Sequence, residues 1–200
     1  MNSLALTDGL LFMCAAYLAW MRYSTIGTRL AYGVIAVAAL LGTLKFSGLY
    51  PMEEWHRLFS IFAGAAALPL LAMAVIWPRS AVVTDRQLAL IFLGAATLLG
   101  LAIAGLGHLR IYDRALGAVS LLSMLAWTVQ QGQWQRSAGL VLMLVGSLLY
   151  VAKVELLAWL SPGDYLHLGM AVGILLLSAW HRPGPYTSLA EQPLNEPERV

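Results

Sequence analysis

The stretch PGDYLHLGMAVGILLLSAW, Pro162–Trp180, places a proline, an acid and a histidine at the head of a long apolar run. About 20 mostly apolar residues cross a bilayer as a helix, so this run predicts a membrane-spanning helix over residues 165–181. The stretch PMEEWHRLF, residues 51–59, has the same order, Pro-x-acid-x-x-His, before another apolar run. Each stretch thus sets two titratable side chains one turn apart where an apolar helix begins.

The composition indicates a protein that is dissolved in lipid. Of the 200 residues, 60% are hydrophobic and 11% are charged, and the mean hydropathy is +0.75. A soluble domain carries about a quarter charged residues. The net charge of +2 and the lack of a basic cluster argue against nucleic-acid binding. We therefore expect an all-α integral membrane protein.

The apolar runs predict seven transmembrane helices in one domain, residues 1–182. The tail, residues 183–200, is rich in proline and glutamate and is expected to be a disordered cytoplasmic segment. The seven runs cover residues 5–21, 30–49, 56–77, 87–107, 112–129, 137–160 and 165–181.

The basic residues between the runs predict the orientation, because cytoplasmic loops carry an excess of Lys and Arg. One face receives Arg22, Arg29, Arg79, Arg86, Arg136 and Arg182, whereas the other receives Arg57, Arg110 and Arg114. The first face should be cytoplasmic, which puts the N-terminus outside and the C-terminus inside. The helices then form a lone first helix and three helical hairpins with outward tips.

Ionisable residues gather in the outer halves of the predicted helices. Such residues are costly inside a membrane and usually have a reason to be there. In a bundle they would converge on a polar pocket with an apolar floor, the usual shape of a ligand site. They are Asp8, Lys45, His56, His108, Lys153, Glu155, Asp164 and His167.

A structural role is the alternative for each of these residues. An acid at a helix start caps free backbone N–H groups, which accounts for Asp8 and Asp164 without a ligand. Lys45 is about one turn from its helix end and can extend to water. Lys153 is expected nearly two turns inside its helix, with Glu155 close behind. These two do not face each other, so each would need a partner on another helix.

Three stretches resemble the CREST superfamily of seven-pass membrane proteins, which includes alkaline ceramidases and the progestin and adipoQ receptors. They are LTDGLL with Asp8, LLGTLKFSG in the second run and GDYLH in the seventh, and they are most similar to a divergent bacterial branch. The resemblance implies a bacterial inner membrane and a zinc ion held by His167 and by Asp8 or Asp164. The chain departs from the family pattern at Lys45, where a histidine is expected, and after His167, where His-x-x-x-His is missing.

Two functions follow from these residues. In the preferred one, the outer pocket binds an anionic lipid-like or other small amphipathic ligand through Lys45, His56, Asp8, Glu155 and His108. The partner could instead be a membrane-protein subunit or a second copy of the chain. The alternative is a metal-dependent hydrolase of lipid amides or esters, in which His167 and Asp164 hold the metal or act as base and Lys153 stabilises negative charge. A transporter is disfavoured, because no ionisable residue continues into the inner halves of the helices.

Overall fold

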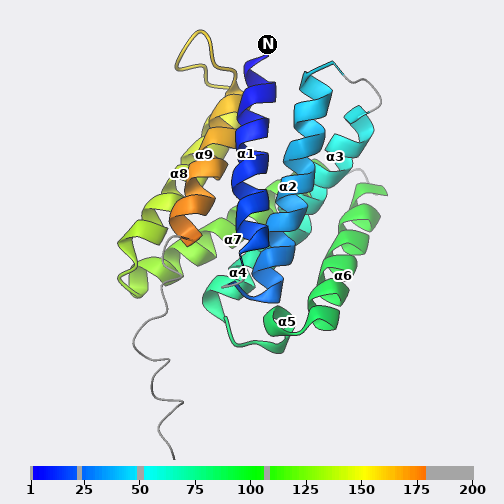
Figure 1. The fold of residues 1–200 in the computed structure, drawn as a ribbon, viewed down its shortest axis with the longest axis vertical. Coiled ribbons are helices and arrows are strands. Elements are labelled where there is room, and N and C mark those ends of the chain that lie inside the picture. Colours follow the sequence, from blue (N-terminus) through cyan, green and yellow to red (C-terminus); the bar gives the residue numbers. More distant parts are fainter. Residues whose placement is uncertain (1, 22–23, 49–51, 106–108, 179–200) are drawn as a thin grey trace, which may run out of the picture.

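The computed structural model describes residues 2–21, 24–48, 52–105 and 109–178 (Figure 1). The described residues form helices and no strand, so the prediction of an all-α protein is confirmed. In chain order the helices are α1 (Ser3–Trp20), α2 (Ile26–Phe46), α3 (Met52–Phe62), the π-helical turn η1 (Ala63–Ala67), α4 (Leu68–Ile76), α5 (Ala81–Thr84), α6 (Arg86–Gly105), α7 (Leu109–Gln130), α8 (Trp134–Val151) and α9 (Pro162–Ser178).

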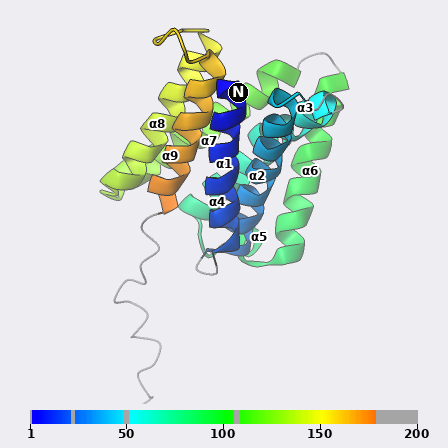
Figure 2. The same cartoon turned by 45° about the horizontal axis from the view of Figure 1, so that its top comes forward.

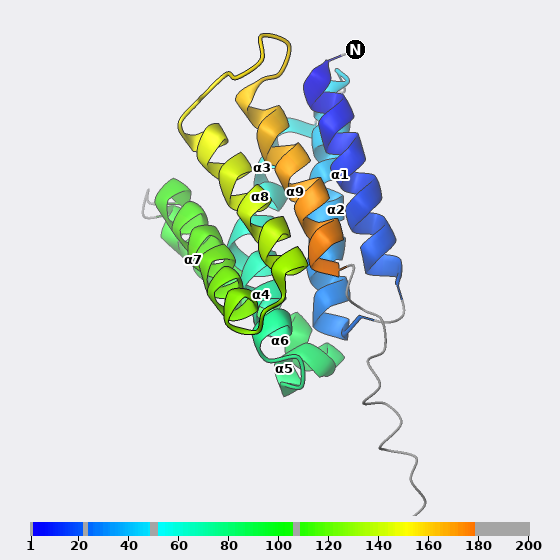
Figure 3. The same cartoon turned by 90° about the vertical axis from the view of Figure 1, so that its left-hand side faces the viewer.

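The long helices lie side by side and run up and down in turn (Figure 1, Figure 2). The start of α1, the end of α2 and the loop between α8 and α9 all lie at one end of the bundle, which we call the N-terminal end. Helix α1 packs between α2 and α9, α8 packs against α9, and α7 bridges α8 and α4 (Figure 3). Neighbours in sequence contact each other in the pairs α2/α3, α6/α7 and α8/α9, and α1 likewise packs against α2.

The surface of the bundle is apolar, as a lipid-facing surface is. Its interior is filled by small and aliphatic side chains such as Ala15, Leu70 and Ile174, all fully buried, while Ile91 is 64% and Leu98 is 68% exposed. Among the described residues, five helical segments are long and apolar enough to cross a membrane. They are Ser3–Trp20, Ile26–Phe46, Met52–Ile76, Arg86–Ile103 and Trp134–Val151.

The third of these segments is one rod built from α3, η1 and α4. Pro69 is the second residue of α4 and has no N–H to donate to the turn before it. The chain widens at this turn, where the N–H of Leu68 donates to the carbonyl of Ala63, five residues back. The π-helical turn therefore lets the helix pass the proline without ending.

Glycines bring α8 and α9 into close contact. A Cβ atom added to Gly146 would lie 2.6 Å from the carbonyl oxygen of Tyr165, and one added to Gly169 would lie 2.7 Å from that of Leu142. Such distances are too short for any side chain, so the two backbones touch directly.

The predicted helix over residues 137–160 is wrong at its C-terminal end. Helix α8 ends at Val151, and Lys153 takes a left-handed conformation with φ of 52°. The N–H groups of Lys153 and Val154 bond back to the carbonyls of Tyr150 and Leu149, which is a Schellman cap. The apolar residues that follow belong to a loop. The other predicted ends lie within a few residues of the observed ones.

This cap also corrects the expected positions of Lys153 and Glu155. Both were expected inside the helix, and both lie beyond its end with exposed side chains. The loop is anchored instead by the Leu157 N–H, which donates to the hydroxyl of Tyr165 on α9 at 2.7 Å. Neither residue therefore needs a partner on another helix.

Candidate functional site

A cavity of about 2100 Å³ opens at the N-terminal end of the bundle. Its lining brings together five of the predicted site residues: Asp8, Lys45, His56, Lys153 and His167. Aliphatic side chains from α1, α2, α4, α7, α8 and α9 form the rest of its wall, among them Leu11, Ile35, Leu68, Leu121, Leu144 and Met170. The lining runs from exposed Lys153 to fully buried Asp8, so the cavity connects the surface with the interior.

Asp164 is fully buried and is held by four hydrogen bonds. The backbone N–H and the hydroxyl of Ser161 donate to its Oδ2 at 2.7 and 2.8 Å, so Asp164 bonds back to the N–H of the residue before α9, as the acid of a capping box does. Two hydroxyls of α1 complete the set: Ser3 donates to Oδ2 at 2.9 Å and Thr7 donates to Oδ1 at 2.8 Å. Asp164 is not among the residues that line the cavity. Its position supports the capping role and adds a link between α9 and α1.

Thr7 connects this carboxylate to His167. Its hydroxyl has a single proton, which it donates to Asp164, so its oxygen is left to accept a hydrogen bond from His167 Nδ1 at 3.4 Å. The other ring nitrogen, Nε2, then faces Asp8 Oδ1 at 3.3 Å. Nε2 and Oδ1 attract each other when one of them carries a proton that points to the other. A chain of polar contacts therefore runs from Asp164 through Thr7 and His167 to Asp8.

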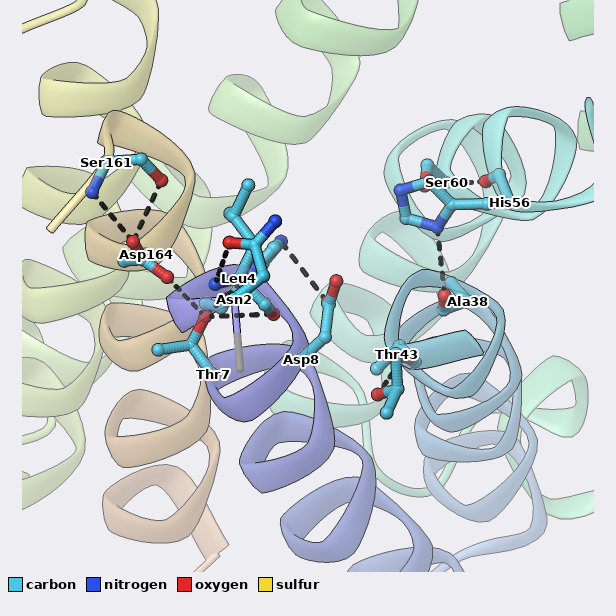
Figure 4. A network of polar contacts seen from close by, with 12 residues as sticks. Asn2, Leu4, Thr7, Asp8, Ala38, Thr43, His56, Ser60, Ser161 and Asp164 are labelled. Atoms are coloured by element: carbon cyan, nitrogen blue, oxygen red, sulfur yellow. Dashed lines mark hydrogen bonds and ion pairs between the residues drawn. The ribbon is translucent and has the colours of Figure 1, made fainter. Parts of the chain in front are cut away.

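Asp8 and Thr7 are adjacent on α1 but face different neighbours. Figure 4 shows Thr7 directed towards Asp164 on α9 and Asp8 directed towards α2. Asp8 is 1% exposed, and neither of its oxygens receives a hydrogen bond from the described residues. Gly42 of α2 makes room for the carboxylate, because a Cβ atom at that position would overlap Asp8 Oδ2.

His56 of α3 reaches the same region from the other side. Its Nδ1 lies 3.2 Å from the carbonyl oxygen of Ala38 and therefore carries the proton of that hydrogen bond. Phe46 packs edge-on against the imidazole ring, with 5.8 Å between the ring centres. The ring is thus fixed by α2, and its Cε1 would lie 2.9 Å from a Cβ atom at Gly42, next to Asp8.

Lys45 lies in the last turn of α2, at the rim of the cavity. Its ammonium group lies 3.3 Å from the carboxylate of Glu53 and 5.2 Å from the centre of the Phe46 ring. The two charged side chains are 28% and 63% exposed, so water screens this ion pair. Lys45 is inside its helix, whereas Lys153 lies beyond the end of α8.

Two predicted site residues remain to be placed, Glu155 and His108. Glu155 is exposed and does not line the cavity. His108 lies outside the described residues. Sequence reasoning missed Ser3, Thr7 and Gly42. The Ser-x-x-Asp spacing of residues 161–164 is a capping signal, whereas nothing local marks Gly42.

The zinc site implied by the CREST resemblance is not supported by the described residues. No group of three or more His, Cys, Asp or Glu side chains gathers there closely enough to hold a metal ion. A catalytic zinc takes three protein ligands. Asp8 and His167 contact each other and provide two.

Comparison with known proteins adds one finding. Residues 3–179 match a family of unknown function, DUF6962, which offers no link to the CREST superfamily. No curated protein and no solved structure matches the chain.

Proposed function

We propose that the chain, which belongs to the DUF6962 family, is a multi-pass membrane protein that binds a small amphipathic ligand in the cavity at its N-terminal end. One observation carries the proposal. The cavity has aliphatic walls, cationic side chains near its mouth and a buried polar pair, Asp8 and His167, in its wall. Ligand pockets for apolar molecules have this design, in which a few polar groups orient a ligand that apolar walls enclose.

The helices support seven membrane passes with the cavity on the outer side. Helices α7 and α9 complete the up-and-down order, although α7 carries three charges in its first turns and α9 has 17 residues. The end of the bundle opposite the cavity carries Arg79, Arg86 and Arg136. By the excess of basic residues in cytoplasmic loops, that end faces the cytoplasm of a bacterial inner membrane.

Cysteine labelling tests this orientation. The chain has a single cysteine, Cys14, so a Cys14→Ser background accepts one new cysteine at a time. We expect Glu155→Cys to react with a membrane-impermeant maleimide applied to the outside of intact cells, and Arg79→Cys to react only after the membrane is opened. Both side chains are exposed in the structure. The opposite pattern, or equal labelling of both, would refute the orientation.

Cations near the mouth favour a ligand with an anionic group. Arg57 and Lys153 line the cavity and have exposed side chains. Lys45 also lines the cavity and pairs with Glu53 at the rim. These cations outnumber the acids of the same lining near the mouth, Glu53 and Glu54. An acyl chain would then lie along the aliphatic wall, with its anionic end at the mouth. The ligand that the sequence analysis favours, an anionic lipid-like molecule, therefore matches the cavity: its anionic group lies at the mouth and its acyl chain lies along the aliphatic wall.

Binding of a fluorescent fatty acid tests this proposal. We expect cis-parinarate to bind the protein in phosphatidylcholine nanodiscs more strongly than it partitions into empty nanodiscs. Combined Arg57→Gln and Lys153→Gln should weaken binding roughly two- to thirty-fold, since two screened charge contacts contribute about 0.2–1 kcal/mol each. The matched control is Arg79→Gln with Arg86→Gln at the opposite end, which should leave binding unchanged. If the protein adds nothing to the partitioning, the proposed function is wrong.

The metal-dependent hydrolase remains the second candidate and has less support. It requires about three ligands and an open position, and the described residues offer the pair Asp8 and His167. Elemental analysis of the purified protein separates the two candidates. One zinc per chain that is lost on His167→Ala would favour the hydrolase over the binding protein.

A further inference from the structure

We infer that the Asp8 carboxylate is the acceptor for a hydroxyl group of the bound ligand, so that the ligand is a hydroxylated amphiphile. The inference rests on the proposed function and specifies the head group of its ligand. It depends on three features of the described residues: an unused buried acceptor, a space built for it, and the charge around it.

The unused acceptor is Oδ2 of Asp8. Oδ1 of this side chain lies 3.3 Å from His167 Nε2, whereas no described residue donates a hydrogen bond to Oδ2. Leaving a buried acceptor unpaired lowers stability, and the loss is larger when the acceptor is charged. The side chain is 1% exposed and yet belongs to the cavity lining. A donor that arrives through the cavity would remove this cost and would be enclosed by the protein.

The space for the carboxylate is provided by Gly42. This residue lies inside α2, where glycine is less favourable than alanine. Its missing side chain leaves the place that Asp8 Oδ2 and His56 Cε1 fill from α1 and α3. Gly33, one of the other glycines of α2, has open space around it and no such neighbour. The carboxylate is thus seated at a specific position between helices.

The charges near this seat select a neutral donor. A second anionic group would meet the Asp8 carboxylate and be repelled. An ammonium group would lie close to Lys45, which is one helical turn from Gly42 and lines the same cavity. A hydroxyl group donates to the carboxylate without either repulsion. With the anionic group of the ligand at the mouth of the cavity, the hydroxyl belongs several carbons along the acyl chain, so that the hydroxyl and not the anionic group meets Asp8.

Competition between two matched fatty acids tests the inference. Dodecanoate and 6-hydroxydodecanoate have the same chain and charge and differ in one hydroxyl group, which lies away from the carboxylate. Each is used to displace cis-parinarate from the protein in nanodiscs. We expect the hydroxylated acid to compete about ten-fold more strongly, because a hydrogen bond to a charged group contributes roughly 1.5 kcal/mol or more.

Two variants show whether Asp8 is the cause. Asp8→Ala removes the acceptor, and Gly42→Ala displaces the carboxylate without removing any polar atom. In both variants the two acids should compete about equally well, whereas the control Gly33→Ala should retain the preference for the hydroxylated acid. If one variant fails to fold, the other still gives the answer.

The outcomes separate this inference from the proposed function. Binding of cis-parinarate without a preference for the hydroxylated acid overturns the inference and leaves the proposed function intact. A preference that survives in both Asp8→Ala and Gly42→Ala places the hydroxyl elsewhere and also overturns it. If cis-parinarate does not bind at all, the proposed function fails and the inference fails with it.

Discussion

Replacing Asp164 by alanine should weaken the contact between α1 and α9. The carboxylate accepts four hydrogen bonds in a fully buried position. After the substitution the hydroxyls of Ser3, Thr7 and Ser161 can rotate towards other acceptors, and Thr7 has the carbonyl of Leu4 at 3.3 Å. The N–H of Ser161 is fixed by the backbone and cannot turn away.

The magnitude follows from these contacts. A hydrogen bond to a charged group contributes about 1.5–3 kcal/mol, and a buried donor without a partner costs about 1–3 kcal/mol. Loss of the capping bond and of one bond between the helices therefore lowers the free energy of unfolding by about 3 kcal/mol or more. For a chain of this length, that corresponds to a fall of about 6–12 °C in Tm.

Cys14 provides the assay. It is the single cysteine, half-buried on α1 and packed against the core, so a thiol-reactive fluorescent maleimide reports the loosening of this helix during heating. Asp85→Ala is the matched control, because Asp85 caps α6 through a single exposed bond to the Leu88 N–H at 2.9 Å. Its loss should cost about 1 kcal/mol. If Tm falls no further for Asp164→Ala than for Asp85→Ala, the hydrogen bonds of Asp164 do not hold α1 to α9 and the reasoning is refuted.

Two further substitutions test the packing and the rim of the cavity. Gly146→Ala should destabilise the protein by about 1–3 kcal/mol in the same thermal assay, because the new Cβ atom would press on the Tyr165 carbonyl and separate α8 from α9. Gly33→Ala should be neutral or slightly stabilising, since it meets open space, and an equal loss in both would contradict the close approach. Lys45→Met should change the free energy of unfolding by less than about 1 kcal/mol, because the ion pair with Glu53 is exposed; a larger loss would show that this pair holds α2 to α3.

The helices were largely predictable because their signals are local. Apolar runs between clusters of Arg, Pro and Gly mark each long helix to within a few residues, and the Pro-x-acid pattern marks the starts of α3 and α9. The end of α8 was not predictable in this way. Lys153 adopts the left-handed conformation that glycine usually supplies, and the apolar run continues through the loop without a break. Apolar character alone therefore does not distinguish a helix from a loop that packs against one.

The site was predictable in its residue types but not in its contacts. We expected Asp8, Lys45, His56 and His167 to converge because they lie towards one end of their apolar runs, and these residues do line one cavity. The division of roles between Asp164 and Asp8 was not visible, because both were expected to cap helix starts. That expectation is wrong for Asp8: α1 begins at Ser3 with Asn2 as its cap, which leaves Asp8 in the second turn. In the structure Asp164 accepts four hydrogen bonds, whereas Asp8 contacts His167 through Oδ1 and receives no hydrogen bond at Oδ2 from the described residues.

Composition and order along the chain were enough to predict an all-helical protein with an apolar surface, since helix formation and the preference for lipid depend on each residue and its near neighbours. The tertiary structure alone established that Thr7 bonds to Asp164 across 157 residues and that Gly42 seats the Asp8 carboxylate. Such contacts depend on how each helix is rotated about its axis and how closely it approaches the next one. Rotation and approach are set by the packing of all the helices together, which no single stretch of the chain encodes.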